Sequence, residues 1–414
     1  METLHPICAG LDVHKDSVVA CVRTQRGRDA TTVTATFGTT TEELVRLFDW
    51  LAEADVTDVV MESTGVYWRP VWKVLLGGFE LNLANAHEVK NVPGRKSDVK
   101  DAQWLAELMA HGLLRPSFVP DQAQQELREL TRTTRQLARE RARHKQRIHK
   151  ILESCNIKLA SVVTDVLGQS GRAIIEAIAA GEVDPIKLAD LAQGTVRKNK
   201  WLPLAKALRG SVRPHDRFML TSELRMYDAV QKEIGLIQAH VSEVLPDPFV
   251  EAAKWLVEIP GFSHESAIEV LAQIGTDMSQ FPSADHLVSW ACLCPRLDST
   301  AGKSRSTRIR QGSQWLKPIL IQTAWAAVRT KGSRLRSYFM HLKSRCGPNK
   351  AIVATAAKLL RIVYALLRDG EVYEERQAAQ DLALQEHQQK RALARLTRQA
   401  RRLGLNVTLT PITA

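Results

Sequence analysis

The sequence has few cysteines, and none is spaced like a zinc ligand or a member of a disulfide framework. Six are scattered over 414 residues, and the one close pair, Cys292 and Cys294, has a single residue between its members. A zinc ribbon uses C-x-x-C pairs, and small disulfide-stapled domains have many more cysteines per residue. The pattern argues against both classes and favours a reducing compartment.

Long hydrophobic runs are also missing. No stretch approaches the ~18 apolar residues that a membrane-spanning helix needs. The N-terminal segment METLHPICAGLDVHKD acquires charges too early for the apolar centre of a signal peptide. We therefore expect a cytoplasmic protein that has no membrane partner.

Acidic residues are outnumbered by basic ones. Against 45 Asp and Glu there are 57 Lys and Arg, which gives a net charge of +12 and an isoelectric point near 9.5. Basic side chains that contact phosphates release counterions, and this release supplies most of the non-specific affinity for nucleic acids. A solvated basic surface would give the same totals, so the charge favours a polyanionic partner without establishing one.

The hydrophobic pattern predicts an α/β domain at 1–120. Three β-branched runs within 7–37 indicate strands, and an amphipathic helix is expected at 42–54. A short apolar strand ending in VVMES and a helix at about 67–76 follow. Three strands, a helix, a strand and a helix are typical of the opening of an α/β fold.

Beyond this domain the sequence predicts mostly helix. Residues 121–159 contain no Gly or Pro and have apolar residues at helical spacing, so we expect one long helix. It opens a basic helical or coiled-coil segment at 121–248, which precedes a mainly α domain at 249–373 and a helical basic tail at 374–414.

The predicted long helix is strongly basic. Between Glu126 and Lys150 nine cations face three acids. A charged helix is ordinarily a solvated face, but this surplus favours a nucleic-acid cradle or a coiled coil lying on nucleic acid. The cations that we assign to nucleic-acid binding on this helix are Arg135, Arg139 and Arg143.

Four acids in the first domain suggest a metal site. Asp12 in GLDVHKD and Glu62 in VVMESTG each end an apolar strand, where a carboxylate is costly unless it is paired, hydrogen-bonded or metal-bound. Asp98 and Asp101, in KSDVKDAQWLAELM, lie three residues apart on one face of a predicted helix. Four carboxylates are enough for two Mg²⁺ ions that serve an in-line phosphoryl displacement.

Each acid also has an ordinary structural alternative. Asp12 fits a turn, Glu62 fits a partner for a nearby arginine, and Asp98 fits a helix N-cap. Taken singly, none of them defines a site. Their joint occurrence at the ends of the right elements favours the metal site.

The segments GLDVHKDSVVACV, MESTGVYWRPVW and NVPGRKSDVKDAQWLAELM resemble the N-terminal DEDD domain of a family of bacterial insertion-sequence transposases related to the pilin-gene invertases. The resemblance implies a fold similar to the RuvC Holliday-junction resolvase, which is a mixed sheet with helices of the ribonuclease H type. It also implies that Asp12, Glu62, Asp98 and Asp101 are the catalytic Mg²⁺ ligands.

The C-terminal part contains two further patterns. WLVEIPGFSHESAIEVLAQIG resembles a helix-hairpin-helix, whose Gly turn lets backbone N–H groups approach a DNA phosphate. Next, DSTAGKSRSTRIR places two hydroxyls before a basic cluster, and a hydroxyl beside cations can attack a phosphodiester. On chemistry alone, a basic loop that contacts phosphates is the favoured alternative. The residues are Ser299 and Thr300, then Lys303, Arg305, Arg308 and Arg310.

The same family has a C-terminal domain with a nucleophilic serine, which this region resembles over about 250–373. Two registers fit, because the family's serine stands either directly before a Gly-Gly-Lys or Ala-Gly-Lys run or one residue earlier, and this sequence has DSTAGK. One register makes Ser299 the nucleophile and the other makes it Thr300. We favour Ser299, because a primary hydroxyl attacks phosphorus with less hindrance than a β-branched one.

The resemblance also implies partners. In this family the RuvC-like and C-terminal domains of different protomers form composite sites in a homo-oligomer, a dimer or a tetramer, and an element-encoded guide RNA pairs with donor and target DNA. We therefore expect a transposase that cleaves and rejoins strands through a phosphoserine intermediate, at the nucleoid of a bacterial cytoplasm. Two alternatives are a structure-selective nuclease that does not rejoin strands and a non-catalytic nucleic-acid-binding protein.

Overall fold

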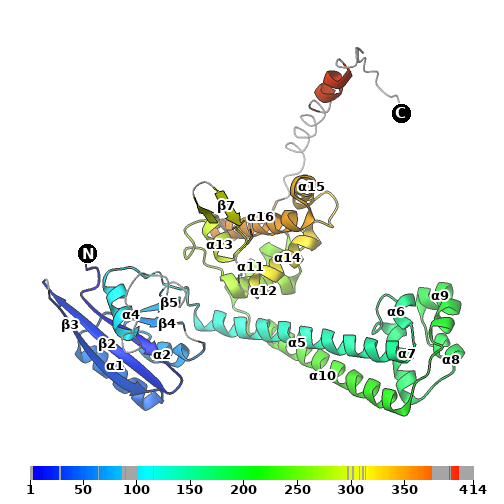
Figure 1. The fold of residues 1–414 in the computed structure, drawn as a ribbon, viewed down its shortest axis with the longest axis horizontal. Helices are drawn as coiled ribbons and strands as arrows, with labels where there is room; N and C mark the ends of the chain where they lie inside the picture. Colours follow the sequence, from blue (N-terminus) through cyan, green and yellow to red (C-terminus); the bar gives the residue numbers. More distant parts are fainter. Residues whose placement is uncertain are drawn as a thin grey trace. The chain divides into compact units, whose positions relative to one another are not determined.

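The computed structural model describes most of the chain as two compact units, Met1–Pro120 and Asp121–Ala414 (Figure 1). Within the described part, no helix combines the length and the apolar character that crossing a membrane requires. The described residues are 3–27, 29–63, 65–85, 89, 101–114, 116–295, 298–300, 303–306, 308–309, 312, 314–374, 391 and 393–400.

A five-stranded mixed sheet forms the centre of the first unit. The strand order is β3-β2-β1-β4-β5, in which β1 to β3 are antiparallel while β4 runs parallel to both β1 and β5. The predicted mixed sheet is therefore confirmed. The strands are β1 (Ile7–Val13), β2 (Ser17–Arg26), β3 (Asp29–Gly38), β4 (Asp58–Glu62) and β5 (Glu80–Ala84).

The two faces of the sheet are covered by different helices, since side chains alternate along each strand. On one face Ala9 and Leu11 of β1 share a core with helices α1 (Thr41–Glu53) and α2 (Trp68–Leu75). On the other face Cys8 shares a core with α4 (Asp101–Ala110). The predicted helices at 42–54 and 67–76 are thus confirmed, each to within one residue.

Helix α4 lies directly on Gly10 of β1. A Cβ atom at this position would be 2.2 Å from the carbonyl oxygen of Ala102 and 2.6 Å from the nitrogen of Ala106. Only glycine permits so close an approach, because both obstacles are backbone atoms. The Cys8 thiol donates to the Ala106 oxygen at 3.4 Å, and burial raises the pKa of this thiol to about 12, so it stays neutral.

The second unit contains two long helices that lie side by side (Figure 1). Helices α5 (Gln122–Ser154) and α10 (Pro214–Val244) run antiparallel, because Arg141 bonds to Gln231 while His144 bonds to Glu223. The predicted long helix is confirmed. It ends at Ser154 rather than 159, because Asn156 adopts a left-handed conformation with φ of 58°.

Four short helices form a separate core at the far ends of α5 and α10. Ile148 and Leu152 of α5 are buried there against Ile174, Leu188 and Leu204. We call this region, residues 155–213, the tip. Its helices are α6 (Leu159–Val162), α7 (Gln169–Ala180), α8 (Pro185–Asp190) and α9 (Gly194–Ala207).

The C-terminal part is mainly helical, as predicted, and encloses one core. A small antiparallel hairpin, β6 (Asp298–Thr300) and β7 (Lys303–Ser306), lies between its helices. Residues 393–400 of the tail are also helical. The helices are α11 (Asp247–Val257), α12 (His264–Ile274), α13 (Ala284–Trp290), α14 (Leu316–Ala327), α15 (Arg334–Cys346) and α16 (Pro348–Asp369).

The substitution Gly10→Ala tests the seat of α4. Because the new methyl group would meet backbone atoms 2.2 and 2.6 Å away, we expect a loss of stability of about 1–3 kcal/mol, the usual cost of overpacking. Gly235→Ala in α10 is the control, since its Cβ would meet nothing within 4 Å. Thermal unfolding should show Gly10→Ala destabilised and Gly235→Ala unchanged or more stable, and equal behaviour would contradict the close seat.

Candidate active site

Asp12 and Glu62 lie at the carboxyl ends of neighbouring parallel strands. Leu11 of β1 is opposite Met61 of β4, so the next residues along the two strands are these two acids. Alternation puts both on the face that α4 covers, the same face as Gly10. Two half-buried carboxylates side by side repel each other unless a cation or donors compensate them.

Asp101 is the first residue of α4 and is exposed. Its neighbour Ala102 lies against Gly10, whereas the helix end at Ala110 accepts from the Leu4 nitrogen at 2.8 Å. The helix therefore runs antiparallel to β1, and Asp101 opens it at the end of the sheet where Asp12 lies. A carboxylate at the start of a helix also interacts favourably with the positive end of the helix dipole. Asp98 lies outside the described residues.

The surroundings of Asp12 and Glu62 test the ordinary structural roles that the sequence also allows for them. Asp12 belongs to β1 rather than to a turn, and Nε2 of His14 lies 3.1 Å from its Oδ2. Glu62 makes no ion pair with any arginine in the described part of the chain. Among these residues no three His, Cys, Asp or Glu side chains are close enough to share an ion. The strand register thus places two acids on neighbouring strand ends, with Asp101 at the same end of the sheet.

The predicted nucleophile segment forms the β6–β7 hairpin. Ser299 pairs with Ser304 and Thr300 with Lys303, so the hydroxyl-bearing strand runs directly beside the basic one. A backbone bridge between Pro295 and Ile309 closes the base of the hairpin. Only the backbone of both strands is described, so the choice between Ser299 and Thr300 stays a prediction. Arg308 is exposed, and Arg310 lies outside the described residues.

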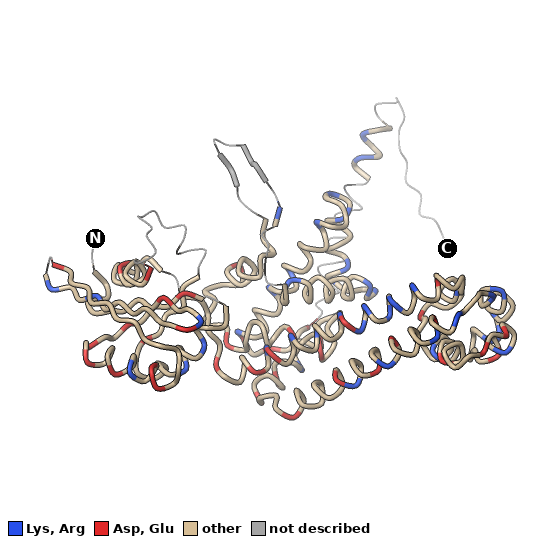
Figure 2. The backbone as a smooth tube through the Cα atoms, turned by 60° about the horizontal axis from the view of Figure 1, so that its bottom comes forward, with Lys and Arg blue, Asp and Glu red and all other residues tan. Residues whose placement is uncertain are grey.

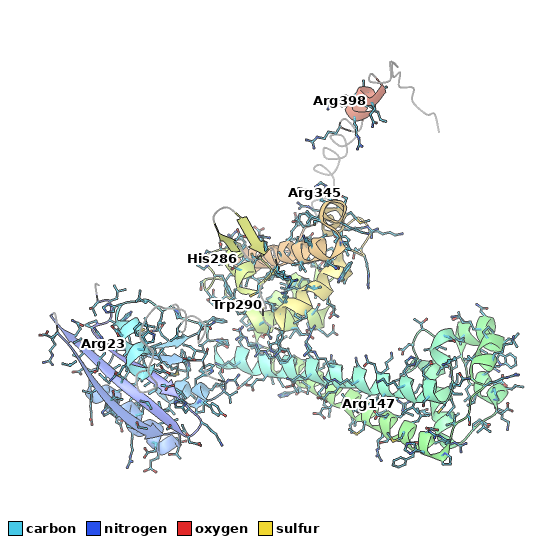
Figure 3. The ribbon with its side chains drawn as sticks, viewed as in Figure 1. Arg23, Arg147, His286, Trp290, Arg345 and Arg398 are labelled. Carbon is cyan, nitrogen blue, oxygen red and sulfur yellow. The ribbon has the colours of Figure 1, made fainter. Side chains whose placement is uncertain are left out.

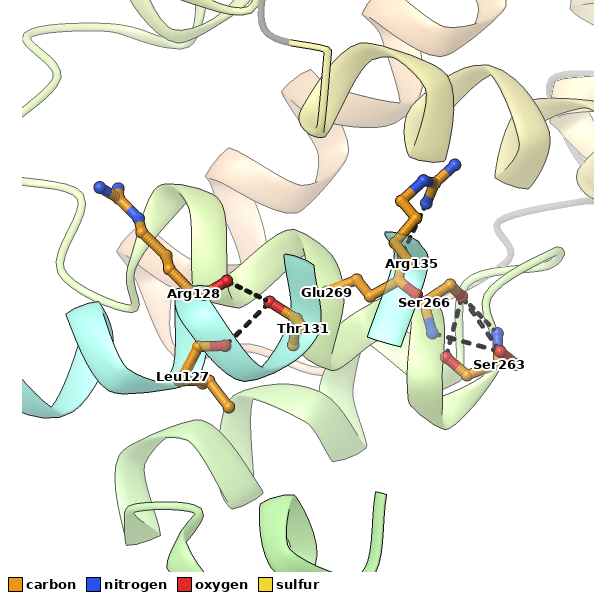
Figure 4. Close-up of polar contacts among 7 residues, drawn as sticks. All are labelled: Leu127, Arg128, Thr131, Arg135, Ser263, Ser266 and Glu269. Atoms are coloured by element: carbon orange, nitrogen blue, oxygen red, sulfur yellow. Dashed lines mark hydrogen bonds and ion pairs between the residues drawn. The ribbon is translucent and has the colours of Figure 1, made fainter. Parts of the chain in front are cut away.

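Several cations of α5 are engaged within the protein. Arg128 donates to the Ala272 oxygen at 2.8 Å. Arg135 pairs with Glu269 at 2.7 Å, and both of these residues are labelled in Figure 4. Burial, and next the nearby Arg132, lower the pKa of Arg128 to about 10. Burial raises the pKa of Glu269, although Arg135 opposes this shift. This end of α5 is therefore built into the C-terminal core.

The other cations of α5 differ in whether they have a partner within the protein. The Arg139 guanidinium lies 5.6 Å from the centre of the Trp315 ring, and that of Arg132 lies 5.5 Å from it. Arg147, which is labelled in Figure 3, reaches Glu223 at 3.7 Å. Arg143 is exposed and has no ion pair among the described residues. The ring of Trp315, which the sequence reading missed, thus links the segment after the hairpin to α5.

The IPGF turn between α11 and α12 is covered by another helix of the same domain. Gly261 has φ of 98°, and a Cβ there would be 2.4 Å from the Ala327 nitrogen, so the turn packs on α14. The Ser263 nitrogen donates to Oγ of Ser266, and the Ser266 nitrogen donates back to Oγ of Ser263 (Figure 4). These amides are satisfied inside the protein, which weakens the expected phosphate contact at this turn.

Comparison with known proteins identifies the family. One family model of DEDD type, described as a transposase, matches residues 9–157, and another, described as "Transposase IS116/IS110/IS902 family", matches 253–340. The chain belongs to this family of insertion-sequence transposases, whose N-terminal DEDD domain precedes a C-terminal transposase domain. The resemblance seen in the sequence is confirmed, and the protein is a DNA-transposing enzyme.

Relatives that match over most of their length agree with this assignment. "Putative transposase y4pF/y4sB" of Sinorhizobium fredii is 29% identical over 80% of this chain and 77% of the relative. "Transposase for insertion sequence element IS1111A" of Coxiella burnetii is 27% identical over 78% and 81%. The RuvC structure from Thermus thermophilus aligns with 27% of this chain and 99% of its own at 14% identity, but its TM-score of 0.22 is too low to define the fold.

The pair of Arg135 and Glu269 gives a test of how α5 is used. We expect Arg135→Ala to lower stability by about 3 kcal/mol, because it leaves a largely buried carboxylate without its partner. Burial already raises the pKa of Glu269, so its charged form, which predominates above that pKa, destabilises the folded state when no cation pairs with it. As the pH falls through this pKa the carboxylate becomes neutral, and the loss of stability caused by Arg135→Ala should shrink.

Thermal unfolding at several pH values measures this effect. Arg143→Ala, an exposed site on the same helix, is the control and should change stability by less than about 0.5 kcal/mol. Adding Glu269→Gln to Arg135→Ala should restore much of the stability. If Arg135→Ala is as mild as Arg143→Ala at every pH, the side chain is free to serve another partner.

Proposed function

We propose that this transposase cleaves and rejoins DNA strands at a site with two Mg²⁺ ions held by Asp12, Glu62, Asp98 and Asp101. The observation that carries the proposal is the placement of Asp12 and Glu62 side by side at the strand ends, with Asp101 opening α4 at the same end. Carboxylate oxygens are the protein ligands that Mg²⁺ prefers. When bound, the ions stabilise the attacking and leaving oxygens of an in-line displacement.

The protein's own groups prepare this site. His14 contacts one oxygen of Asp12 and so orients its carboxylate. Gly10 holds α4 against β1, which fixes the start of the helix and hence the backbone of Asp101. Both effects reduce the freedom that ligand side chains would lose on binding a cation.

We further propose that Ser299 is the nucleophile of strand exchange. Its Oγ would bond to phosphorus while the phosphodiester bond to the leaving oxygen breaks, and the proton that the hydroxyl loses is balanced by the one that the leaving oxygen gains. A covalent link of this kind conserves the phosphodiester, so the strand can be rejoined. The neighbouring basic strand supports this role, since cations stabilise the developing charge. Lys303 and Arg305 belong to this strand, and Arg308 and Arg310 follow it in the sequence.

The proposed partners are donor and target DNA, an element-encoded guide RNA and further copies of this chain. Base pairing with RNA would supply sequence recognition, while the protein reads backbone and shape. A dimer or tetramer would bring the acids of one protomer to the serine of another. The bacterial nucleoid is the corresponding place of action, and the four-part domain division remains part of this proposal.

The metal-site assignment predicts a specific loss of chemistry. With the purified protein, its RNA, both DNA partners and Mg²⁺, we expect Asp12→Asn and Asp101→Asn each to slow strand cleavage at least about a thousandfold, because bound ions supply several kcal/mol of transition-state stabilisation. DNA binding should be retained. Asp16→Asn is the control, since Asp16 is an exposed acid in the turn after β1. Full activity in either ligand variant would remove that residue from the site.

The nucleophile assignment predicts a covalent adduct. A denaturing gel of reactions with labelled DNA should show a protein–DNA band for the unaltered protein and for Thr300→Ala but none for Ser299→Ala. Ser304→Ala, on the partner strand of the same hairpin, controls for disturbance of the hairpin and should keep the band. A band that persists in Ser299→Ala and disappears in Thr300→Ala would transfer the role to Thr300.

A further inference from the structure

A stretch that runs from the tip into the first residues of α10 has cations but no acids. Residues 191–215, which include all of α9, contain no Asp or Glu. Both family models leave this stretch unmatched, because they cover 9–157 and 253–340. Its cations are Arg197, Lys198, Lys200, Lys206, Arg209 and Arg213.

The orientation of α9 is fixed by its inner face. Leu204, Ala205 and Leu208 are buried in the core of the tip. Trp201 packs against the same core, and its indole N–H donates to Oδ1 of Asp190 at 2.9 Å. These contacts leave a defined outer face toward solvent.

The outer face has a regular row of cations. Lys198 and Lys206 are eight residues apart, slightly more than two helical turns, so they lie about 80° from each other around the helix and about 12 Å apart along its axis. Arg209 follows one turn later, just after the helix ends at Ala207. All three side chains are exposed. We call Lys198, Lys206 and Arg209 the basic row.

The charge of the basic row is not compensated. In the described part of the chain, none of its three side chains makes an ion pair or a hydrogen bond, and the same holds for Arg197. By contrast, Arg213 bonds to Asp216 at 2.8 Å. Several cations of α5 are likewise engaged within the protein, although Figure 2 shows how basic that helix is. On α5, Arg143 and Lys150 are likewise exposed and without a partner in the described part of the chain, but most of its other cations are engaged, whereas the whole basic row is free.

We propose that the basic row binds the phosphate backbone of duplex DNA. DNA is the substrate of a transposase, and cations without counter-charges gain most from replacing the counterions of a duplex. Single-stranded RNA is instead recognised through stacking on aromatic rings. Trp201 is the one aromatic residue in 191–215, and its indole is held by Asp190 and the tip core. This inference rests on the family's DNA-transposing activity and on neither the metal site nor the serine.

The test is DNA binding by the full chain in EDTA, where no strand chemistry takes place. Fluorescence anisotropy with a short labelled duplex, repeated at several salt concentrations, compares the unaltered protein with the triple variant Lys198→Gln, Lys206→Gln, Arg209→Gln. We expect the triple variant to bind at least about tenfold more weakly. The slope of log K against log salt concentration should fall in magnitude by roughly 2 to 3, since each lost phosphate contact removes about 0.9 from it.

The matched control is the triple variant Lys145→Gln, Lys158→Gln, Lys187→Gln. It removes the same charge from the tip and its immediate neighbourhood, but each of these lysines is already paired with a carboxylate. We expect its slope to change by less than about 1. Equal losses in the two triple variants would reduce the effect to net charge and overturn the proposal. Thermal unfolding should show both variants as stable as the unaltered protein.

Repeating the measurement with single-stranded RNA of the same sequence separates the two nucleic acids. The proposal expects the larger loss with duplex DNA. A loss confined to RNA would overturn it. Because binding is measured without metal and without strand exchange, failure of the Mg²⁺ or serine assignments would leave this result unchanged.

Discussion

The close approach of α4 to Gly10 is the constraint on which the first unit depends. Without a side chain at this position, a helix backbone reaches the middle strand of a sheet and closes its second face. That contact fixes the direction of α4 and therefore the end of the sheet at which Asp101 begins. The acid pair on β1 and β4 would exist without it, but the third carboxylate would have no fixed place.

Much of the first unit could be predicted because its signals are local. Strand alternation and helix periodicity gave the mixed sheet and both helices, and Asp12 and Glu62 were recognised as acids that end apolar strands. The role of Gly10 could not be predicted, because it depends on contact with a helix about ninety residues later in the chain. The burial of the IPGF turn could not be predicted either, because it depends on contact with α14, about sixty residues later in the chain.

The cations show where sequence reasoning was least reliable. Composition drew attention to α5, where positive charge is densest, but charge density does not reveal whether a guanidinium already has a partner. Arg135 and Arg128 are held by groups on α12, more than a hundred residues away. Helix α9 has fewer cations than α5, but no acid lies among them in the sequence, so their charge is less often neutralised. Counting acids beside cations would have found it.

The length of α5 sets a distance within the second unit. From Arg128, bonded to the C-terminal core, to Leu152, buried in the core of the tip, one uninterrupted helix spans twenty-four residues, or about 36 Å. One turn of duplex DNA is about 34–36 Å long. Because no break interrupts the helix between these two residues, α5 holds the core of the tip and the C-terminal core at a fixed separation close to the length of one turn of duplex DNA.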